Sequence, residues 1–336
     1  MDNISIIEVF ISGRRIGRMA LTPEGMCGFE YDADWIQTGF SISPFYLPLK
    51  SGLIMAKRDP FGGNFGVFDD SLPDGWGNLL LDRYLQERGI DPYKLNILER
   101  LSLIGSTGRG ALEYYPDKSV VTDAEYLNFD SLAKEVAKIL ESKESKGSVD
   151  LLYKYGGSSG GARPKIFTKV DGREWLVKFK ATNDPVDVGE IEYNYSLLAR
   201  DCGIRMAETR LFDNRYFGVE RFDRVPQGKI HTVSAAGLLH ANYRIPSLDY
   251  SILLKLTLNL TKDMEQVAEM FRLMVFNVLI SNRDDHAKNL SFQWANGAWK
   301  LSPAYDLLPS NGFNGYHTRH CPRFCVNRKL EDSSFI

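Results

Sequence analysis

The sequence predicts an α+β fold in which short antiparallel hairpins alternate with helices. Two hairpins are indicated by the dipeptides Asp171-Gly172 and Asn296-Gly297, each of which separates two runs rich in β-branched and aromatic residues. Helices are indicated by apolar residues that recur at spacings of three and four, most clearly between residues 264 and 281. Strands and helices are therefore expected in both halves of the chain.

Length and composition are those of a globular protein. The chain has 336 residues, of which 43% are hydrophobic and 25% are charged, and this length is enough for two or three packed lobes. The formal net charge of −2 provides no large basic surface for nucleic acid. The first residues lack the basic segment of a secretory signal, and no apolar run reaches the roughly 20 residues of a membrane span. We therefore expect a cytoplasmic protein that makes no membrane contact.

The first third of the chain predicts a hairpin followed by helices. Residues 3–11 and 16–21 have strand character, and Gly13 lies at the turn between them. The segment that begins with SLPDGWG predicts a helix that ends near Gly89, a residue suited to a C-terminal cap. Further helices are predicted at about residues 93–103 and 131–142. The charged stretch at about 142–149 is typical of a linker or a solvated turn.

A glycine- and serine-rich loop at residues 156–165 precedes two predicted strands, KIFTKV and EWLVKF. Alternation in the second strand places Lys178 and Leu176 on the face opposite three apolar residues, Trp175, Val177 and Phe179. The helix that follows is predicted to start at Asp187, in a capping box with a glutamate three residues on, and to end at Gly203. Glu192 lies at the edge of its apolar side. A carboxylate in that position needs a cationic partner, so we expect an ion pair with Lys178.

Three polar residues near the end of the chain are expected to form the catalytic site. Asp284 is followed five residues later by Asn289, and the hairpin at 296–297 brings Asp306 back to the same edge. Protein kinases have a catalytic aspartate, an asparagine and a metal-binding aspartate in this order. Asp284 would orient an attacking hydroxyl, and the oxygens of Asn289 and Asp306 suit Mg²⁺. The expected fold is thus protein-kinase-like and two-lobed, with an extra β-rich N-terminal subdomain.

Several neighbouring residues have simpler explanations. Asp285 is expected to be a solvated loop acid, and His286 a structural histidine that holds the loop or contacts Asp306. A zinc site built from the terminal histidines and cysteines is disfavoured because their spacing fits known sites only loosely; these residues are His317, His320, Cys321 and Cys325. Eight apolar residues of the 264–281 helix are expected to be core: Met264, Val267, Ala268, Phe271, Met274, Val275, Val278 and Leu279.

Taken together, these blocks resemble the HipA family of bacterial toxin kinases over nearly the whole chain. The blocks that carry the resemblance are FDDSLPDGWGNLLLDRYL, SSGGARPK, WLVKFK, IEYNYSLLARDCGI, VERFDR, DDHAKNLSF and LSPAYDLLPS. The glycine/serine loop departs from a Walker A loop, because no Gly-Lys-Ser/Thr follows it. The resemblance implies a serine/threonine-protein kinase that uses ATP and Mg²⁺.

The resemblance also implies a role for individual residues. Asp284 matches the catalytic aspartate, and Asn289 and Asp306 match the Mg²⁺ ligands. ATP contacts are implied for Lys178, for Gly160 and Gly161 in the phosphate loop, and for backbone groups of Glu220 and Phe222 beside adenine. Glu192 and His286 take supporting roles. Ser158 matches the loop serine that the family autophosphorylates, with Ser159 as a substitute.

The partners that the resemblance implies are proteins. Family members work in toxin–antitoxin pairs with a small helix-turn-helix antitoxin, so DNA would be contacted only indirectly, through that antitoxin. The best-known class of protein substrate is an aminoacyl-tRNA synthetase. The phosphorylated protein is accordingly expected to be translation-related.

We expect four segments: an N-terminal subdomain at 1–120, an ATP-binding N-lobe at 121–225, a mostly helical catalytic C-lobe at 226–310, and an atypical tail at 311–336. The C-lobe is expected to be shortened, because related chains continue after the DLLPS-like block. An alternative is therefore a catalytically impaired remnant that binds nucleotide or antitoxin. Another is a small-molecule kinase of the aminoglycoside or lipid type, although the N-terminal blocks favour HipA.

Overall fold

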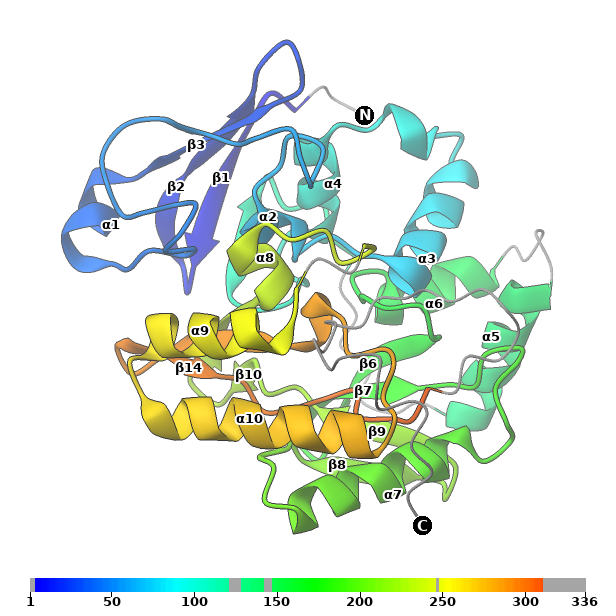
Figure 1. The fold of residues 1–336 in the computed structure, drawn as a ribbon. Coiled ribbons are helices and arrows are strands. Elements are labelled where there is room, and N and C mark those ends of the chain that lie inside the picture. Colours follow the sequence, from blue (N-terminus) through cyan, green and yellow to red (C-terminus); the bar gives the residue numbers. More distant parts are fainter. Residues whose placement is uncertain (1–3, 121–127, 142–146, 246–247, 311–336) are drawn as a thin grey trace.

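The computed structural model describes residues 4–120, 128–141, 147–245 and 248–310, and within them the predicted α+β fold is confirmed (Figure 1). The predicted tail at 311–336, with its cysteines and histidines, lies outside the described residues. Among the described helices, none is both long enough and apolar enough to cross a membrane.

The N-terminal part contains a five-stranded antiparallel sheet with the strand order β4-β3-β2-β1-β5. Its strands are β1 (Ile6–Ile11), β2 (Arg14–Leu21), β3 (Cys27–Tyr31), β4 (Ile54–Met55) and β5 (Leu112–Tyr115). The accompanying helices are α1 (Ala33–Thr38), α2 (Gly66–Asp69), α3 (Gly75–Gln86) and α4 (Ile97–Ile104), with a 3-10 turn at Pro92–Lys94. The predicted hairpin is confirmed, with Gly13 at its turn in the left-handed region at φ +75°.

The next part is the kinase-like N-lobe, a four-stranded antiparallel sheet with the order β6-β7-β9-β8. Its strands are β6 (Lys165–Val170), β7 (Arg173–Lys178), β8 (Thr209–Phe212) and β9 (Tyr216–Glu220). Its helices are α5 (Phe129–Glu141), α6 (Ser148–Gly156) and α7 (Val188–Asp201). The Asp171-Gly172 turn is confirmed, since both residues have positive φ angles, 51° and 75°.

The C-lobe combines a three-stranded antiparallel sheet, β12-β13-β14, with three helices. Its strands are β12 (His231–Ser234), β13 (Ser291–Ala295) and β14 (Ala298–Leu301), preceded by the small ribbon of β10 (Arg224–Val225) and β11 (Gly228–Lys229). Its helices are α8 (Ala235–Leu239), α9 (Tyr250–Thr261) and α10 (Met264–Leu279), and a 3-10 turn covers Ala287–Asn289. The Asn296-Gly297 hairpin is confirmed.

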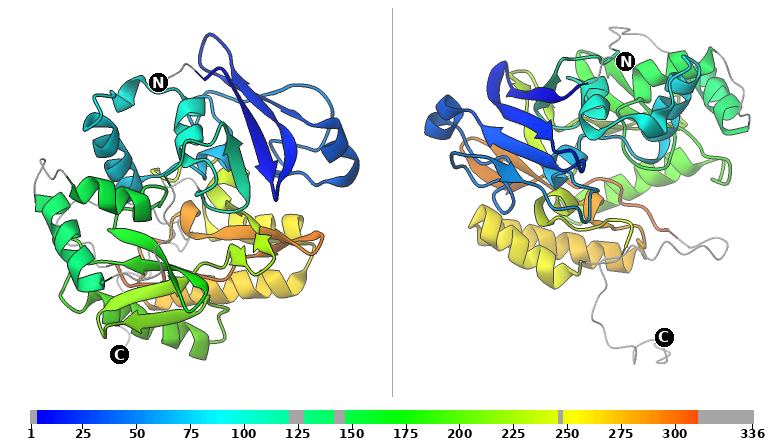
Figure 2. Two further views of the ribbon diagram at one scale, coloured as in Figure 1. Left: turned by 180° about the vertical axis from the view of Figure 1, so that it is seen from behind. Right: turned by 90° about the horizontal axis from the view of Figure 1, so that it is seen from above.

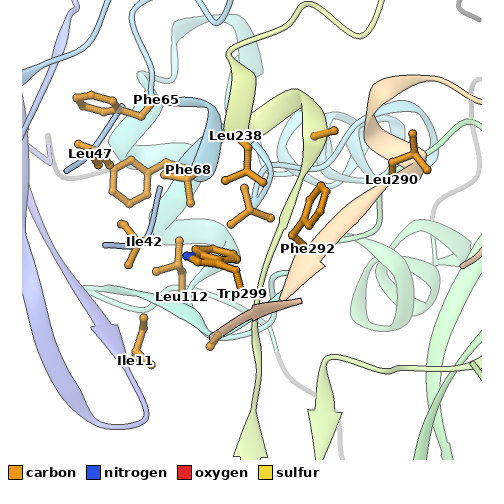
Figure 3. Packing of buried hydrophobic residues seen from close by; sticks show 14 of the residues in the cluster. Ile11, Ile42, Leu47, Phe65, Phe68, Leu112, Leu238, Leu290, Phe292 and Trp299 are labelled. Carbon is orange, nitrogen blue, oxygen red and sulfur yellow. The ribbon is translucent and has the colours of Figure 1, made fainter. Parts of the chain in front are cut away.

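Two hydrophobic cores hold these parts together. One core joins the N-terminal sheet directly to the C-lobe, and Figure 3 shows Leu112 of that sheet beside Trp299 of the C-lobe strands. The other joins α3, α5 and α6 to the N-lobe sheet. Figure 2 shows the same arrangement from two further sides, with the N-terminal sheet next to the C-lobe strands. The predicted boundaries at 120 and 225 stay predictions, and packing crosses both of them.

Three details of the sequence prediction are wrong. The linker or solvated turn expected at about 142–149 is wrong in its last residues, because α6 begins at Ser148; residues 142–146 lie outside the described residues. Asp187 does precede α7, but its side chain makes no capping hydrogen bond. The third error concerns α10, where the expected core residues include strongly exposed ones, such as Phe271 at 52% and Leu279 at 77%.

The buried side of α10 is instead formed by Met270, Leu273, Phe276 and Asn277. Apolar residues occur on nearly all sides of this helix, so their spacing identifies a helix without selecting the side that faces the core. The exposed apolar residues of α10 are Met264, Phe271, Val275, Val278 and Leu279.

One buried histidine gives the fold a predicted pH dependence. His231 on β12 is 3% exposed, and its Nε2 lies 2.8 Å from the Ile42 carbonyl oxygen. Burial lowers the pKa of His231 from 6.5 to about 4, although the bond to Ile42 opposes this shift. The unfolded chain therefore binds more protons between these two values, and the free energy of unfolding falls as pH decreases, by up to about 1.4 kcal/mol per pH unit.

Urea unfolding from about pH 7 to about pH 5 tests this dependence. His231→Gln retains an N–H donor for Ile42 but does not titrate, so we expect a shallower loss of stability on acidification than in the parent protein. Burial also lowers the pKa of His240 to about 4, but this histidine is present in both the parent protein and the variant. Parallel stability curves for parent and variant would contradict the assignment.

Candidate active site

Lys178 joins the two lobes at the centre of the site. It ends β7, and its ammonium group donates to Glu192 Oε1 on α7 at 2.5 Å and to Asp306 Oδ1. The side chains of Lys178 and Glu192 are only 9% and 4% exposed. Burial opposes the charge on Lys178, but the two carboxylates outweigh burial and raise its pKa above the ordinary value. The predicted Lys178–Glu192 ion pair is confirmed.

Asp306 reaches this position because the chain after β14 is fixed to the N-lobe. Ala304 forms a parallel bridge with Met206, and its N–H donates to the Arg205 carbonyl oxygen at 2.8 Å. Burial of Asp306 disfavours its charged form, but the ammonium groups of Lys178 and Lys165 hold its pKa well below the usual range. A carboxylate whose ionised form is favoured in this way suits a hard divalent cation.

Asp284 and Asn289 belong to the loop between α10 and β13. Asn289 Nδ2 donates to the Asp284 carbonyl oxygen at 2.9 Å, and the Asp284 N–H donates to Asn282 Oδ1 at 3.1 Å. The Asp284 side chain is 63% exposed. Asn282 Nδ2 also donates to the Asp306 carbonyl oxygen at 3.3 Å, which ties this loop to the segment that carries Asp306.

The two neighbours of Asp284 differ in how well the sequence predicted them. Asp285 is 3% exposed and accepts a 2.6 Å hydrogen bond from the Tyr250 hydroxyl, so the expectation of a solvated acid was wrong. His286 accepts a hydrogen bond from the Lys288 N–H through Nδ1, and its Nε2 lies 4.0 Å from Asp284 Oδ1. It therefore holds the loop, as predicted.

The glycine/serine loop is folded against the N-terminal subdomain. The Gly161 N–H donates to the Asp74 carboxylate, and the Lys165 ammonium group donates to the Gly160 carbonyl oxygen at 2.6 Å. Ser159 is fully buried, and its hydroxyl donates to the Gly156 carbonyl oxygen at 2.6 Å. Ser158 is only partly buried and donates weakly to the Thr107 carbonyl oxygen, at 3.2 Å. Of the two serines, Ser158 is the accessible one.

The connection between the lobes contains Glu220 and Phe222. The Glu220 N–H donates to the Glu208 carbonyl oxygen at 2.8 Å, and the Phe222 carbonyl oxygen accepts from Gln293 Nε2 at 3.1 Å. Both of these backbone groups already form hydrogen bonds within the protein. Fewer backbone groups of this connection therefore remain to bind a nucleotide base. The Phe222 ring lies 5.6 Å from the ring of Tyr305.

Beside this connection lies a cavity of about 470 Å³. Its wall includes Ser158 from the loop, Phe167 from β6 and Arg221 from the connection. Arg221 lies over the Phe167 ring, with 4.4 Å between its guanidinium carbon and the ring centroid. The size of the cavity is in the range of small-molecule sites.

Sequence reasoning missed three residues that the fold brings to the site. Asp74 precedes α3, and its only sequence signal is an acid beside two glycines in PDGWG. Arg109 has no such signal; it donates to the hydroxyls of Ser291 and Tyr305 at 2.5 and 2.6 Å. Asp223 is 5% exposed, and its carboxylate accepts a hydrogen bond from the Gly110 N–H at 2.8 Å. The same carboxylate also accepts hydrogen bonds from two arginines.

The chain is similar to several known proteins. "Putative kinase Y4dM" of Sinorhizobium fredii is 24% identical over 92% of this chain and 78% of its own length. "Toxin YjjJ" of Escherichia coli is 28% identical over 46% of this chain and 38% of its own length. Among solved structures, the Shewanella oneidensis MR-1 toxin–antitoxin complex of HipA, HipB and operator DNA contains a chain with a TM-score of 0.66 and 19% identity, over 90% of this chain and 76% of that one.

This likeness shows a common fold, which agrees with the kinase-like arrangement of the two lobes. The family comparison covers both parts of the chain. The HipA N-terminal domain matches residues 7–115, and the HipA-like C-terminal domain matches residues 157–330. The chain therefore belongs to the HipA family.

Proposed function

We propose that the chain is an ATP- and Mg²⁺-dependent protein serine/threonine kinase and the toxin of a toxin–antitoxin pair. One observation carries the proposal: Lys178 contacts Glu192 of α7 and Asp306 at once, next to the loop of Asp284 and Asn289. This arrangement brings a buried cation into contact with the Asp306 carboxylate, and Asn282 ties the loop of the exposed Asp284 carboxylate to the same segment. Phosphoryl transfer depends mainly on positioning and on charge stabilisation, which these groups supply.

The exposure of Asp284 supports a macromolecular acceptor. Its carboxylate is 63% exposed, so the hydroxyl of a protein side chain can approach it and be oriented by a hydrogen bond. Lys178 would offset charge on the ATP phosphates. Asn289 and Asp306 have the oxygen ligands to hold Mg²⁺, which would neutralise further phosphate charge when bound. The cavity lined by Ser158, Phe167 and Arg221 is our candidate for the adenine-binding site.

Partners follow from the family and not from contacts in this chain. The related Shewanella HipA is described in a complex with HipB and operator DNA. We propose by analogy that a helix-turn-helix antitoxin binds this chain and that DNA is contacted only through it. A translation-related protein, such as an aminoacyl-tRNA synthetase, is the proposed substrate.

Self-phosphorylation is the most direct test. Purified protein incubated with ATP and Mg²⁺ is expected to gain one phosphate on Ser158, detected by mass spectrometry, because Ser158 is accessible and Ser159 is not. Ser158→Ala should remove the modification, and Ser159→Ala should retain it. Asp284→Ala should slow it by at least about 100-fold and still bind ATP.

The outcomes separate the candidate functions. Modification that persists in Asp284→Ala would refute the role given to this carboxylate. Binding of ATP without any transfer, to Ser158 or to a protein substrate, would favour the alternative of a remnant that binds nucleotide or antitoxin. Transfer to an aminoglycoside or lipid headgroup instead of protein would favour a small-molecule kinase.

A further inference from the structure

Asp74 occupies an unusual position for a residue at the start of a helix. It is the N-cap of α3, where an aspartate normally accepts hydrogen bonds from the first backbone N–H groups of its own helix. Its side chain makes no such bond. The carboxylate is directed elsewhere, so the local stability that a cap provides is given up at this helix. An N-cap aspartate that does not cap its helix suggests a second role.

The two oxygens of Asp74 contact two different parts of the active site. Oδ1 accepts from the Gly161 N–H in the glycine/serine loop. Oδ2 accepts from the Lys288 ammonium group at 2.9 Å, and Lys288 belongs to the loop that begins at Asp284. The side chains of Asp74 and Lys288 are only 13% and 12% exposed. Charge-assisted hydrogen bonds shielded from water in this way are short and strong.

The residues that follow Asp74 also fit closely against the loop. The Trp76 N–H donates to the Gly161 carbonyl oxygen at 2.9 Å, and its indole N–H donates to the Lys165 carbonyl oxygen at 3.0 Å. A Cβ on Gly75 would lie 2.5 Å from the Gly161 carbonyl oxygen. A Cβ on Gly77 would lie even closer to the carbonyl oxygen of Ser159. Both glycines are therefore required for this close approach.

Lys288 is fixed on its other side as well. Its ammonium nitrogen lies 4.1 Å from the centroid of the Tyr243 ring, a favourable cation–π distance. The ammonium group of Lys288 is therefore held on two sides, by the Asp74 carboxylate and by the Tyr243 ring. Figure 1 shows α3 beside α6, the helix that leads into the glycine/serine loop.

We propose that Asp74 is a positioning residue, which holds the glycine/serine loop and the Asp284 loop at a fixed separation. This inference rests on the proposed function, because it assigns the loop to phosphate binding. It also explains the SLPDGWG block: the aspartate accepts the two hydrogen bonds, and the glycines permit the contact. The N-terminal subdomain would then contribute directly to nucleotide binding without touching the reacting atoms.

Hydrogen exchange of residues 157–164 tests the proposal independently of activity. Asp74→Asn keeps an oxygen for Gly161 but removes the charge that binds Lys288, and Asp74→Ala removes both contacts. We expect exchange in this segment to be about tenfold faster or more in the Ala variant, with a smaller increase in the Asn variant. Exchange within about twofold of the parent in both variants would overturn the proposal.

Asp82→Asn is the matched control. Asp82 lies on the same helix and is 20% exposed, but its partners, Asn78 and Arg100, are within the N-terminal part. The control should leave exchange at 157–164 unchanged, even if it lowers stability. An increase equal to that of Asp74→Asn would show that any weakening of α3 loosens the loop, and this would overturn a specific role for Asp74.

Kinetics supply a second readout. For Asp74→Asn we expect kcat/KM for ATP to fall about tenfold to 100-fold, mostly through a higher KM, because the loop binds phosphates in the ground state. A lower KM would overturn the proposal, since Asp74 would then compete with phosphate. Should the parent protein transfer no phosphate, the proposed function fails, and the exchange experiment still decides whether Asp74 holds the loop.

Discussion

Replacing Lys178 with methionine is expected to lower the rate of phosphoryl transfer by about 100-fold to 1000-fold, since it removes the fixed cation of the site. It should also destabilise the protein by about 3 kcal/mol, because Glu192 would be left ionised at 4% exposure. Arg163, 3.7 Å from Glu192 Oε2, limits this loss. The transfer assay and urea unfolding measure the two effects separately.

A second substitution distinguishes the two roles of Lys178. Glu192→Gln, added to Lys178→Met, removes the buried charge and should restore most of the lost stability. Activity should not return, because the cation that faces the phosphates is still absent. Recovery of both properties together would mean that Lys178 acts only by stabilising the fold.

Replacing Asp223 with alanine is expected to cost about 3 kcal/mol of stability or more. The carboxylate accepts from Arg221 and Arg224, at 3.0 and 2.8 Å, and both guanidinium groups are about as buried as Asp223 itself. Burial opposes its charge, but the two arginines outweigh burial and hold its pKa far below the usual range. Its contribution is therefore present above about pH 4 and decreases as pH falls further.

Glu30→Ala is a suitable comparison for Asp223→Ala. Glu30 pairs with Arg18 at 2.8 Å, but the two side chains are 36% and 68% exposed, so solvent weakens the interaction. We expect this variant to lose less than about 1 kcal/mol, measured in the same urea experiment. A similar loss in both variants would contradict the importance given to burial at Asp223.

The sequence predicted the elements with local signals well. Asp171-Gly172 and Asn296-Gly297 require left-handed backbone, and few alternatives to a tight turn satisfy that requirement. The Lys178–Glu192 pair was predictable because each residue belongs to a regular element. The periodicity of the strand fixes the side on which Lys178 lies, and the periodicity of the helix does the same for Glu192. The order of Asp284, Asn289 and Asp306 along the chain was then sufficient to predict a kinase-like fold.

Features that depend on long-range packing were not predictable in this way. The periodicity of α10 could not distinguish its buried side from its exposed one, since apolar residues lie on both. Asp285 is buried because Tyr250, 35 residues away along the chain, supplies a hydroxyl for it. Asp74 lies 87 residues before its partner Gly161, and no spacing rule relates the two.

The first 120 residues contact the active site, and these contacts limit which N-terminal parts can be exchanged between members of the family. Asp74 binds the glycine/serine loop, Arg109 binds Ser291 and Tyr305, and the Gly110 N–H binds Asp223. A chimera that joins the N-terminal part of one family member to the C-terminal part of another would have to match all three contacts. The two parts should therefore vary together across related chains, as a single inherited unit.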